Sequence, residues 1–290
     1  MHGPSPHAPS WCLASRTVSQ CTSAEVTAAI VHCFQNYLVQ MQFTPEKYEI
    51  RFRGEDLDPF ASRVYHSEGM PAAIVMIARR GWTSRLAAMA VAPDFRRRGL
   101  GKEVMQVALQ EAALRKDRSM ILEVFEQNLA AVSLYIGLGF RPIRRLIGYD
   151  LRPEGSRDRA SDSERLQEID PAIVARLIAQ DGEPDLPWIL MPETFAAATL
   201  PVQALHLDEI AFAIVADPKA EKIVVRALLV RKTHRRQGWG SRILRALGAL
   251  FADRPLAIQG LVPENMAPGL FLGSGWQRQT LNQFEMKIEF

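Results

Sequence analysis

Val91-Ala92-Pro93-Asp94-Phe95-Arg96-Arg97-Arg98-Gly99-Leu100-Gly101-Lys102 joins the end of an apolar run to a basic loop and then to two spaced glycines. The preceding residues, Arg85–Val91, predict a strand, and the amphipathic pattern of Gly99–Arg115 predicts a helix. The first amides of a helix have no partners within it, and the macrodipole places positive potential there. Glycine also lets a phosphate approach the backbone closely. The stretch therefore predicts an anion-binding loop at a helix N-terminus.

The same arrangement occurs a second time, at Val230-Arg231-Lys232-Thr233-His234-Arg235-Arg236-Gln237-Gly238-Trp239-Gly240-Ser241. Both copies share a strand, a basic loop, the pattern Arg-x-x-Gly-x-Gly and a helix. Two matches in register predict an internal repeat, and Gly99 and Gly238 lie about one domain length apart. Neither copy matches Gly-x-x-x-x-Gly-Lys-Ser/Thr, so the sequence does not indicate a P-loop nucleotide site.

Composition agrees with two globular domains. The chain has 290 residues, of which 48% are hydrophobic, and a net charge of +3, which requires no nucleic-acid partner. The three cysteines (Cys12, Cys21 and Cys33) show no paired spacing, so we expect neither a disulfide framework nor a metal site. The first ten residues do not have the pattern of a secretory signal, and no apolar stretch is long enough to cross a bilayer. We therefore expect a cytoplasmic protein without a membrane partner.

The pattern along the chain predicts two similar sets of helices and strands. In the first set we expect helices at Ala24–Gln40, from Pro45, at Gly99–Arg115 and at Leu129–Gly137, and strands at Leu13–Ser19, Ser62–His66, Ala72–Arg79, Arg85–Val91, Met120–Phe125 and Arg141–Leu151. In the second we expect helices at Ile169–Ala179 and Gly238–Phe251, and strands at Ala211–Ala216, Lys222–Arg231, Leu256–Leu261 and Gln283–Phe290. The polar stretch Arg152–Arg165 has the composition of a linker. This predicts a tail at 1–11, a first domain at 12–152, a linker at 153–165 and a second domain at 166–290.

A second set of motifs follows the first loop. Leu122-Glu123-Val124-Phe125-Glu126-Gln127-Asn128 precedes Ala130-Ala131, then Leu134-Tyr135, then Gly139-Phe140. Together with the Arg-x-x-Gly-x-Gly loop, this order resembles the GNAT superfamily of N-acetyltransferases over roughly Leu86–Asp150. The resemblance implies an α+β (mixed α/β) chain of two tandem GNAT folds, each a mostly antiparallel central sheet flanked by helices. It also implies an acetyl-CoA-dependent enzyme with the first domain catalytic.

The resemblance also implies roles for individual residues. Tyr135 would protonate the departing CoA thiolate, and Glu123 would accept a proton from the amine, directly or through water. The backbone amides of Arg96 to Gly101 would hold the pyrophosphate, the backbone groups of Met89 and Val91 would pair with the pantetheine arm, and Asn128 would contact CoA or stabilise the loop before its helix. The cofactor-binding residues that it implies are Met89, Val91, Arg96, Arg97, Arg98, Gly99, Leu100, Gly101, Lys102 and Asn128.

The chemistry agrees with these residue types. A protonated amine cannot attack a thioester, so a base is useful, and a neutral phenol can donate a proton to the leaving thiolate. Each residue also has an ordinary structural interpretation. Tyr135 fits helix packing, Glu123 fits a solvated or structural carboxylate, and Asn128 fits a helix N-cap. The arginines of the loop fit a solvated basic face.

The second copy lacks the expected acid and base. Phe271 stands at the position of Tyr135 and has no hydroxyl, and Gln259 or Gly260 stands near that of Glu123. This copy keeps a candidate second CoA loop, formed by Arg235, Arg236, Gln237, Gly238, Trp239, Gly240 and Ser241, and it is expected to lack part of the front of the fold. It either binds CoA without turnover, or is purely structural, or acts through other residues, and we favour the structural interpretation.

Acetyl transfer to a primary amine, on a small molecule or a protein, is therefore the predicted function. The alternative is a non-catalytic acyl-CoA sensor or regulatory protein. A nucleic-acid binder is disfavoured, because the arginine clusters lie where CoA phosphates would bind and no aromatic residues alternate with them. Both a monomer and a homodimer fit the sequence.

Overall fold

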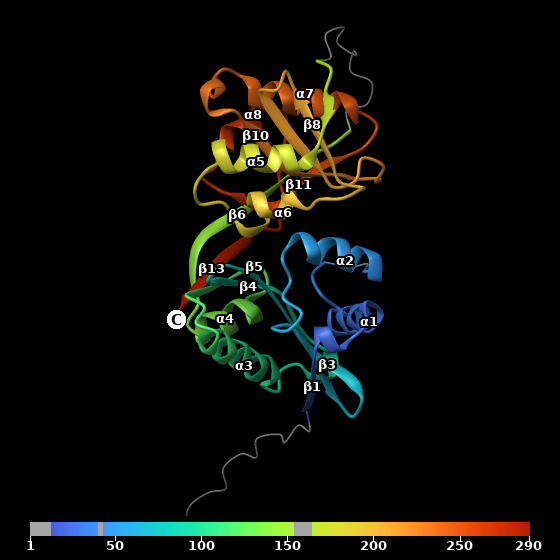
Figure 1. Cartoon of the computed structure of the whole chain (residues 1–290), viewed down its shortest axis with the longest axis vertical. Helices are drawn as coiled ribbons and strands as arrows, with labels where there is room; N and C mark the ends of the chain where they lie inside the picture. The colour runs from blue at the N-terminus through green and yellow to red at the C-terminus, as the bar shows by residue number, and fades with distance from the viewer. Residues whose placement is uncertain (1–12, 40–42, 154–163) are drawn as a thin grey trace, which may run out of the picture. The chain divides into compact units, whose positions relative to one another are not determined.

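The computed structural model describes residues 13–39, 43–153 and 164–290 (Figure 1). The chain forms two compact units: unit 1 comprises 1–122, 133–140 and 287–290, and unit 2 comprises 123–132 and 141–286. This division differs from the contiguous domains predicted above, because β5 (Ser119–Phe125), α4 (Leu129–Gly137) and β13 (Gln283–Glu289) each contribute residues to both units. The predicted tail (1–11) and most of the predicted linker (153–165) lie outside the described residues.

Unit 1 is built on a sheet with the strand order β1-β2-β3-β4-β5. Its pairs are antiparallel except for β4 and β5, which run parallel. The strands wholly within the unit are β1 (Leu13–Thr17), β2 (Arg63–Ser67), β3 (Met70–Arg80) and β4 (Thr83–Val91), and its helices are α1 (Ser23–Cys33), α2 (Pro45–Gly54) and α3 (Leu100–Leu114).

Alternation along β3 explains why both faces of this sheet are covered. Successive side chains of a strand point to opposite faces. Ile74 and Met76 pack with Val26, Ile30 and Phe52 of α1 and α2 in one core cluster, whereas α3 contacts β3 and β4. Figure 1 shows α1 and α2 on one side of these strands and α3 on the other. The continuous apolar run in β3 therefore reflects burial on both faces.

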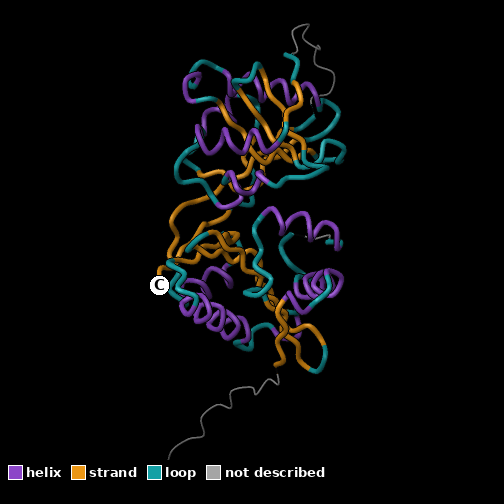
Figure 2. Tube along the Cα trace, in the orientation of Figure 1, coloured by secondary structure: helices purple, strands orange, loops and turns teal. Residues whose placement is uncertain are grey.

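Unit 2 repeats this design with the strand order β6-β11-β10-β9-β8-β7, and β12 pairs with β6. Among these described strands β10 and β11 pair in parallel and the other pairs are antiparallel. Figure 2 colours the strands orange and the helices purple. The strands are β6 (Arg141–Leu151), β7 (Gln167–Ile169), β8 (Gln203–Leu207), β9 (Ala211–Val215), β10 (Ile223–Val230), β11 (Leu256–Pro263) and β12 (Gln277–Arg278), and the helices are α5 (Pro171–Asp181), α6 (Pro192–Ala196), α7 (Trp239–Leu250) and α8 (Pro268–Gly273).

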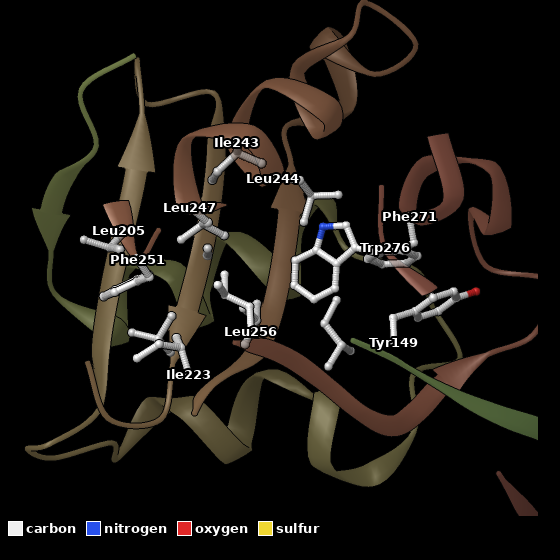
Figure 3. Close-up of a cluster of buried hydrophobic side chains, with 14 of the residues drawn as sticks. Tyr149, Leu205, Ile223, Ile243, Leu244, Leu247, Phe251, Leu256, Phe271 and Trp276 are labelled. Carbon is white, nitrogen blue, oxygen red and sulfur yellow. The ribbon is translucent and has the colours of Figure 1, made fainter. Parts of the chain in front are cut away.

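The expectation that the second copy lacks part of the front of the fold is wrong. β7, α5, α6 and β8 precede β9 in unit 2, as β1, α1, α2 and β2 precede β3 in unit 1. Residues of α5 and α6 pack on one face of the sheet and those of α7 and α8 on the other. Figure 3 shows the second cluster, with Tyr149, Phe271 and Trp276 lying together at one end. The sequence concealed this front part because β7, α6 and β8 are short.

The predicted fold class is confirmed: the chain is a mixed α/β protein with mostly antiparallel sheets and flanking helices. The largest error in a single element concerns α1, which ends at Cys33 and not at Gln40. Phe34 and Leu38 continue its apolar spacing, but contacts from elsewhere in the fold occupy the helix end. No helix within the described ranges combines the length and the apolar character needed to cross a bilayer.

Candidate active site

β4 loses its partner on one side partway along its length. Its parallel pairing with β5 ends at Leu86 and Leu122. Its pairing with β3 continues to Val91, but a register shift leaves Ala87 without an opposite residue. Such a β-bulge bends a strand and increases its twist. From Ala87 to Val91 the strand therefore pairs with β3 alone among the described strands, which leaves one edge of its backbone for a ligand.

The loop after β4 has the conformation of an anion-binding turn. Arg97 and Gly99 both have positive φ, of 60° and 89°. α3 starts at Leu100, and its first backbone bonds run from the amides of Lys102 and Glu103 to the carbonyl oxygen of Gly99. The amides of Gly99, Leu100 and Gly101 precede these donors. A row of amides in a left-handed turn before a helix favours a phosphate.

The two glycines serve different purposes in the structure. Gly99 supplies the positive φ, and a β-carbon there would meet nothing within 4 Å. A β-carbon at Gly101 would lie 3.2 Å from Cε of Met89 and 3.6 Å from Cδ2 of Leu134. The second glycine therefore allows α3 to pack closely on β4 and α4, which the sequence argument attributed to phosphate access.

Several groups of this loop already have partners within the protein. Leu100 is buried in the core. The guanidinium group of Arg96 donates hydrogen bonds to three backbone carbonyls, those of Val91, Cys33 and Gln35. Arg97, Arg98 and Lys102 are exposed. The amide of Arg96 donates to the carbonyl oxygen of Pro93 at 3.2 Å, so both its amide and its side chain already have partners. Leu100 offers its backbone, not its side chain, to a ligand in this loop.

Tyr135 lies in the part of α4 that belongs to unit 1, next to Leu134. It is 6% exposed, and its ring packs edge-on against Phe140 at 5.8 Å. Burial raises the pKa of its phenol well above the ordinary value, and the nearby Tyr37 raises it further. The hydroxyl therefore stays protonated at neutral pH, as a proton donor requires. Tyr37 was not recognised in the sequence, because the apolar spacing placed it inside a longer helix.

Unit 1 thus brings together Met89 and Val91 of β4, the loop at 96–102, and α4 with Tyr135. Glu123 and Asn128 belong to unit 2. Asn128 accepts a hydrogen bond from the amide of Ala131 at 3.2 Å, so its side chain caps the start of α4.

Glu123 is half-buried near another carboxylate, that of Glu285. The pKa of Glu285 is raised overall. Burial is the largest cause, the ion pair with Arg144 opposes it, and the charge of Glu123 raises the pKa further. The carboxylate of Glu123 therefore lies near the ion pair between Glu285 and Arg144.

Unit 2 repeats the loop geometry closely. Arg236 and Gly238 have φ of 62° and 87°, and α7 starts directly afterwards at Trp239. A β-carbon at Gly240 would lie 3.0 Å from Leu270, the counterpart of Leu134. The register of β10 also shifts at Arg226, in the position of Ala87. The repeat predicted from the loops therefore extends to the bulge and to the packing of the second glycine.

The space beside this second bulge is nearly filled. The cavity there has a volume of about 20 Å³ and is lined by Ile189, Leu190, Val224, Val225, Arg226, Ile258, Gln259, Leu261 and Val262. That is room for about one water molecule. Phe271 is 5% exposed and stacks on Tyr149 at 4.4 Å, so the position of the expected acid is core packing (Figure 3).

Comparison with known proteins agrees with this geometry. Residues 27–140 match the model of the acetyltransferase (GNAT) family. The ribosomal protein bS18-alanine N-acetyltransferase of Salmonella typhimurium is 44% identical over 52 residues, which are 18% of this chain and 35% of that protein. The N-terminal acetyltransferase B complex catalytic subunit of Schizosaccharomyces pombe is 31% identical over 83 residues, which are 28% and 45%. The chain therefore spans less than half the length of either relative.

Solved structures show the same fold over nearly the whole chain. The GCN5-related N-acetyltransferase from Sphaerobacter thermophilus has a TM-score of 0.67 at 14% identity, covering 96% of this chain and 95% of that chain. The tandem GNAT protein from the clavulanic acid biosynthesis pathway has a TM-score of 0.66 at 14% identity, covering 96% and 98%.

Proposed function

Because residues 27–140 match the acetyltransferase (GNAT) family and the chain has the fold of GNAT proteins, we propose that it is an acetyl-CoA-dependent N-acetyltransferase with its working site in unit 1. The observation that carries the proposal is the combination, in one unit, of the bulged strand edge, the left-handed loop before α3 and the buried phenol of Tyr135. In a protein of the tandem GNAT form, unit 2 then serves as the second copy.

Each part of the site contributes one element of an acyl transfer. The amides at the start of α3 hold the pyrophosphate of CoA, and the edge of β4 from Ala87 to Val91 pairs with its pantetheine arm. The amine attacks the thioester carbon, which forms the amide bond and breaks the carbon–sulfur bond. Tyr135 donates its proton to the departing thiolate, for which a protonated phenol is required. Glu123 is the proposed base by its position in the sequence motif, and a water network is the alternative.

Unit 2 is proposed to bind no acyl-CoA. Its loop has the required backbone, but the cavity beside the bulge of β10, on the edge where a pantetheine arm would pair, has a volume of only about 20 Å³. This supports the structural interpretation of the second copy, and it predicts one acetyl-CoA per chain.

The acceptor is proposed to be a primary amine. One relative is named as the catalytic subunit of an N-terminal acetyltransferase complex and another as an alanine N-acetyltransferase of ribosomal protein bS18. Peptides with a free α-amine, including one that begins with alanine, therefore belong first in a test panel. Polyamines, lysine and aminoglycosides complete the panel.

Calorimetry and steady-state kinetics test the proposal. We expect one acetyl-CoA site per chain and amine-dependent release of CoA. Tyr135→Phe keeps the ring and its packing on Phe140 but removes the proton donor, so we expect kcat to fall about 100-fold with unchanged acetyl-CoA affinity. Binding of acetyl-CoA without turnover of any amine would favour the acyl-CoA sensor instead. An unchanged kcat in Tyr135→Phe would remove Tyr135 from the mechanism.

A further inference from the structure

Arg96 connects two segments that lie far apart in the sequence. Its Nε donates to the carbonyl oxygen of Val91 at 2.9 Å. One terminal nitrogen, Nη2, donates to the carbonyl oxygens of Cys33 at 3.1 Å and of Gln35 at 2.6 Å. The guanidinium group therefore ties the end of β4 to the end of α1.

Two of the carbonyl groups that Arg96 binds, those of Cys33 and Gln35, lie at the end of α1 and just after it. The last carbonyls of a helix have no intrahelical donor, and the negative end of the helix dipole favours a cation. Arginine is suited to bridging them, because its planar group presents several donors in a fixed geometry. The interaction accounts for the end of α1 at Cys33 and fixes the turn that follows.

That turn carries an aromatic pair. Asn36 has a φ of 58°, and the amide of Tyr37 bonds to the carbonyl oxygen of Phe34 at 3.1 Å, which closes the turn. The rings of Phe34 and Tyr37 meet edge-on at 5.0 Å. Leu134, next to Tyr135 on α4, and Val91, which Arg96 binds, both lie 3.6 Å from the position that a β-carbon would take at Gly101, so α4 and the turn meet the same end of β4. Tyr37 also raises the pKa of Tyr135. The turn at 34–37 therefore lies beside the proposed proton donor.

We propose that Arg96 is a positioning residue that holds the turn at 34–37 next to Tyr135, so that the acceptor amine meets the bound thioester in a productive geometry. This inference rests on the proposed function. It assigns the side chain of Arg96 to the acceptor side of the site, while the amides of Gly99, Leu100 and Gly101 remain for the cofactor.

Unit 2 contains the counterpart of the Arg96 contact. Arg235 donates to the carbonyl oxygens of Val230, at the end of β10, and of Asp181, at the end of α5. The residues that follow, Gly182-Glu183-Pro184-Asp185, include no aromatic side chain. The contact is thus a feature of both copies, and only in unit 1 does it hold an aromatic pair beside a buried phenol.

The test compares Arg96→Gln and Arg96→Lys with Arg63→Gln in the full chain. Arg63 makes a half-buried ion pair with Glu111 at 2.6 Å in the same unit, so its loss matches the structural cost without touching the turn. We expect Arg96→Gln to keep acetyl-CoA affinity within about 2-fold and to lower kcat/KM for the acceptor about 10-fold, mainly through KM. Arg96→Lys keeps the charge but offers fewer fixed donors, so we expect a smaller loss. Arg63→Gln should lower the melting temperature with little change in acceptor KM.

Hydrogen exchange gives a readout that does not depend on turnover. Amides at 34–38 should exchange faster in Arg96→Gln and at the wild-type rate in Arg63→Gln, both measured by mass spectrometry. If Arg96→Gln does not fold, the same comparison is made with Arg96→Lys.

The outcomes separate this inference from the proposed function. Equal acceptor kinetics in Arg96→Gln and Arg63→Gln would overturn the inference and leave the enzyme intact. Loss of acetyl-CoA binding in Arg96→Gln would assign the side chain to the cofactor and also overturn it. A wild-type chain that acetylates no amine would refute the proposed function first, and unchanged exchange at 34–38 would then refute the positioning role as well.

Discussion

Gly99→Ala tests the origin of the left-handed loop, and unit 2 supplies its matched control. Gly99 has φ 89° and ψ −14°, and Gly238 has φ 87° and ψ −5°. An L-residue in this region costs roughly 1–2 kcal/mol. A β-carbon at either position would meet nothing within 4 Å, so no steric cost adds to this strain. We therefore expect Gly99→Ala and Gly238→Ala each to lower the free energy of unfolding by about 1–2 kcal/mol.

Urea unfolding followed by circular dichroism measures these losses, and calorimetry with acetyl-CoA separates the two variants. Gly99→Ala shifts the amides that precede α3, so we expect its acetyl-CoA affinity to fall about 10-fold, which corresponds to about 1.4 kcal/mol. Gly238→Ala should bind acetyl-CoA like the wild type, because the cavity beside the bulge of β10 in unit 2 holds about one water molecule. Unfolding energies equal to the wild type would refute the strain argument. A comparable loss of affinity in Gly238→Ala would refute the assignment of cofactor binding to unit 1.

Three further predictions follow from buried groups. Burial opposes ionisation of Glu55, but neighbouring arginines outweigh it and lower the pKa of this carboxyl to about 2, so its contribution to stability is present above about pH 4.3 and lost as the pH falls towards 2. Glu55→Gln removes the negative charge that lies 2.7 Å from the buried guanidinium group of Arg85, and urea unfolding at pH 7 should show a loss in the free energy of unfolding of about 3–5 kcal/mol that narrows at pH 2. Burial raises the pKa of Cys33 to about 12, so iodoacetamide at pH 8 should label it only after unfolding, which peptide mapping detects, and labelling of the native chain would contradict its burial. Phe271→Tyr places a hydroxyl in a packed core and should cost about 1–3 kcal/mol by urea unfolding, without restoring CoA release in a Tyr135→Phe background, and restored turnover would contradict the structural role of unit 2.

The sequence was most informative where a local backbone preference and a short spacing act together. The two glycine loops, the helices that follow them and the strands before them were all placed correctly, because positive φ, helix starts and apolar periodicity are properties of neighbouring residues. The same holds for Phe271, whose lack of a hydroxyl is a chemical fact of the residue itself.

Errors arose where distant segments compete for the same groups. The apolar spacing of α1 continues past Cys33, yet the helix stops there, where Arg96, about 60 residues away, binds the carbonyls at its end. The partners of Arg96 could not be predicted for the same reason, because a basic residue in such a loop gives no sign that its amide and its guanidinium group both bond to protein carbonyls. The sequence argument for Gly101 considered phosphate access alone, and the structure adds that its missing β-carbon makes room for Met89 and Leu134.

By itself, the sequence determined the repeated loop, the mixed α/β class and the presence of a phenol at the position of Tyr135 in only one copy. These depend on residue identity and on spacing over a few turns of chain. Only the tertiary structure decided how the residues divide into two units, where α1 ends and that the cavity beside the second bulge, lined in part by Ile189 and Leu190, has a volume of only about 20 Å³. Those features depend on packing between segments far apart in the chain, because whether a cavity stays open is set by every side chain that reaches it and not by the motif at its edge.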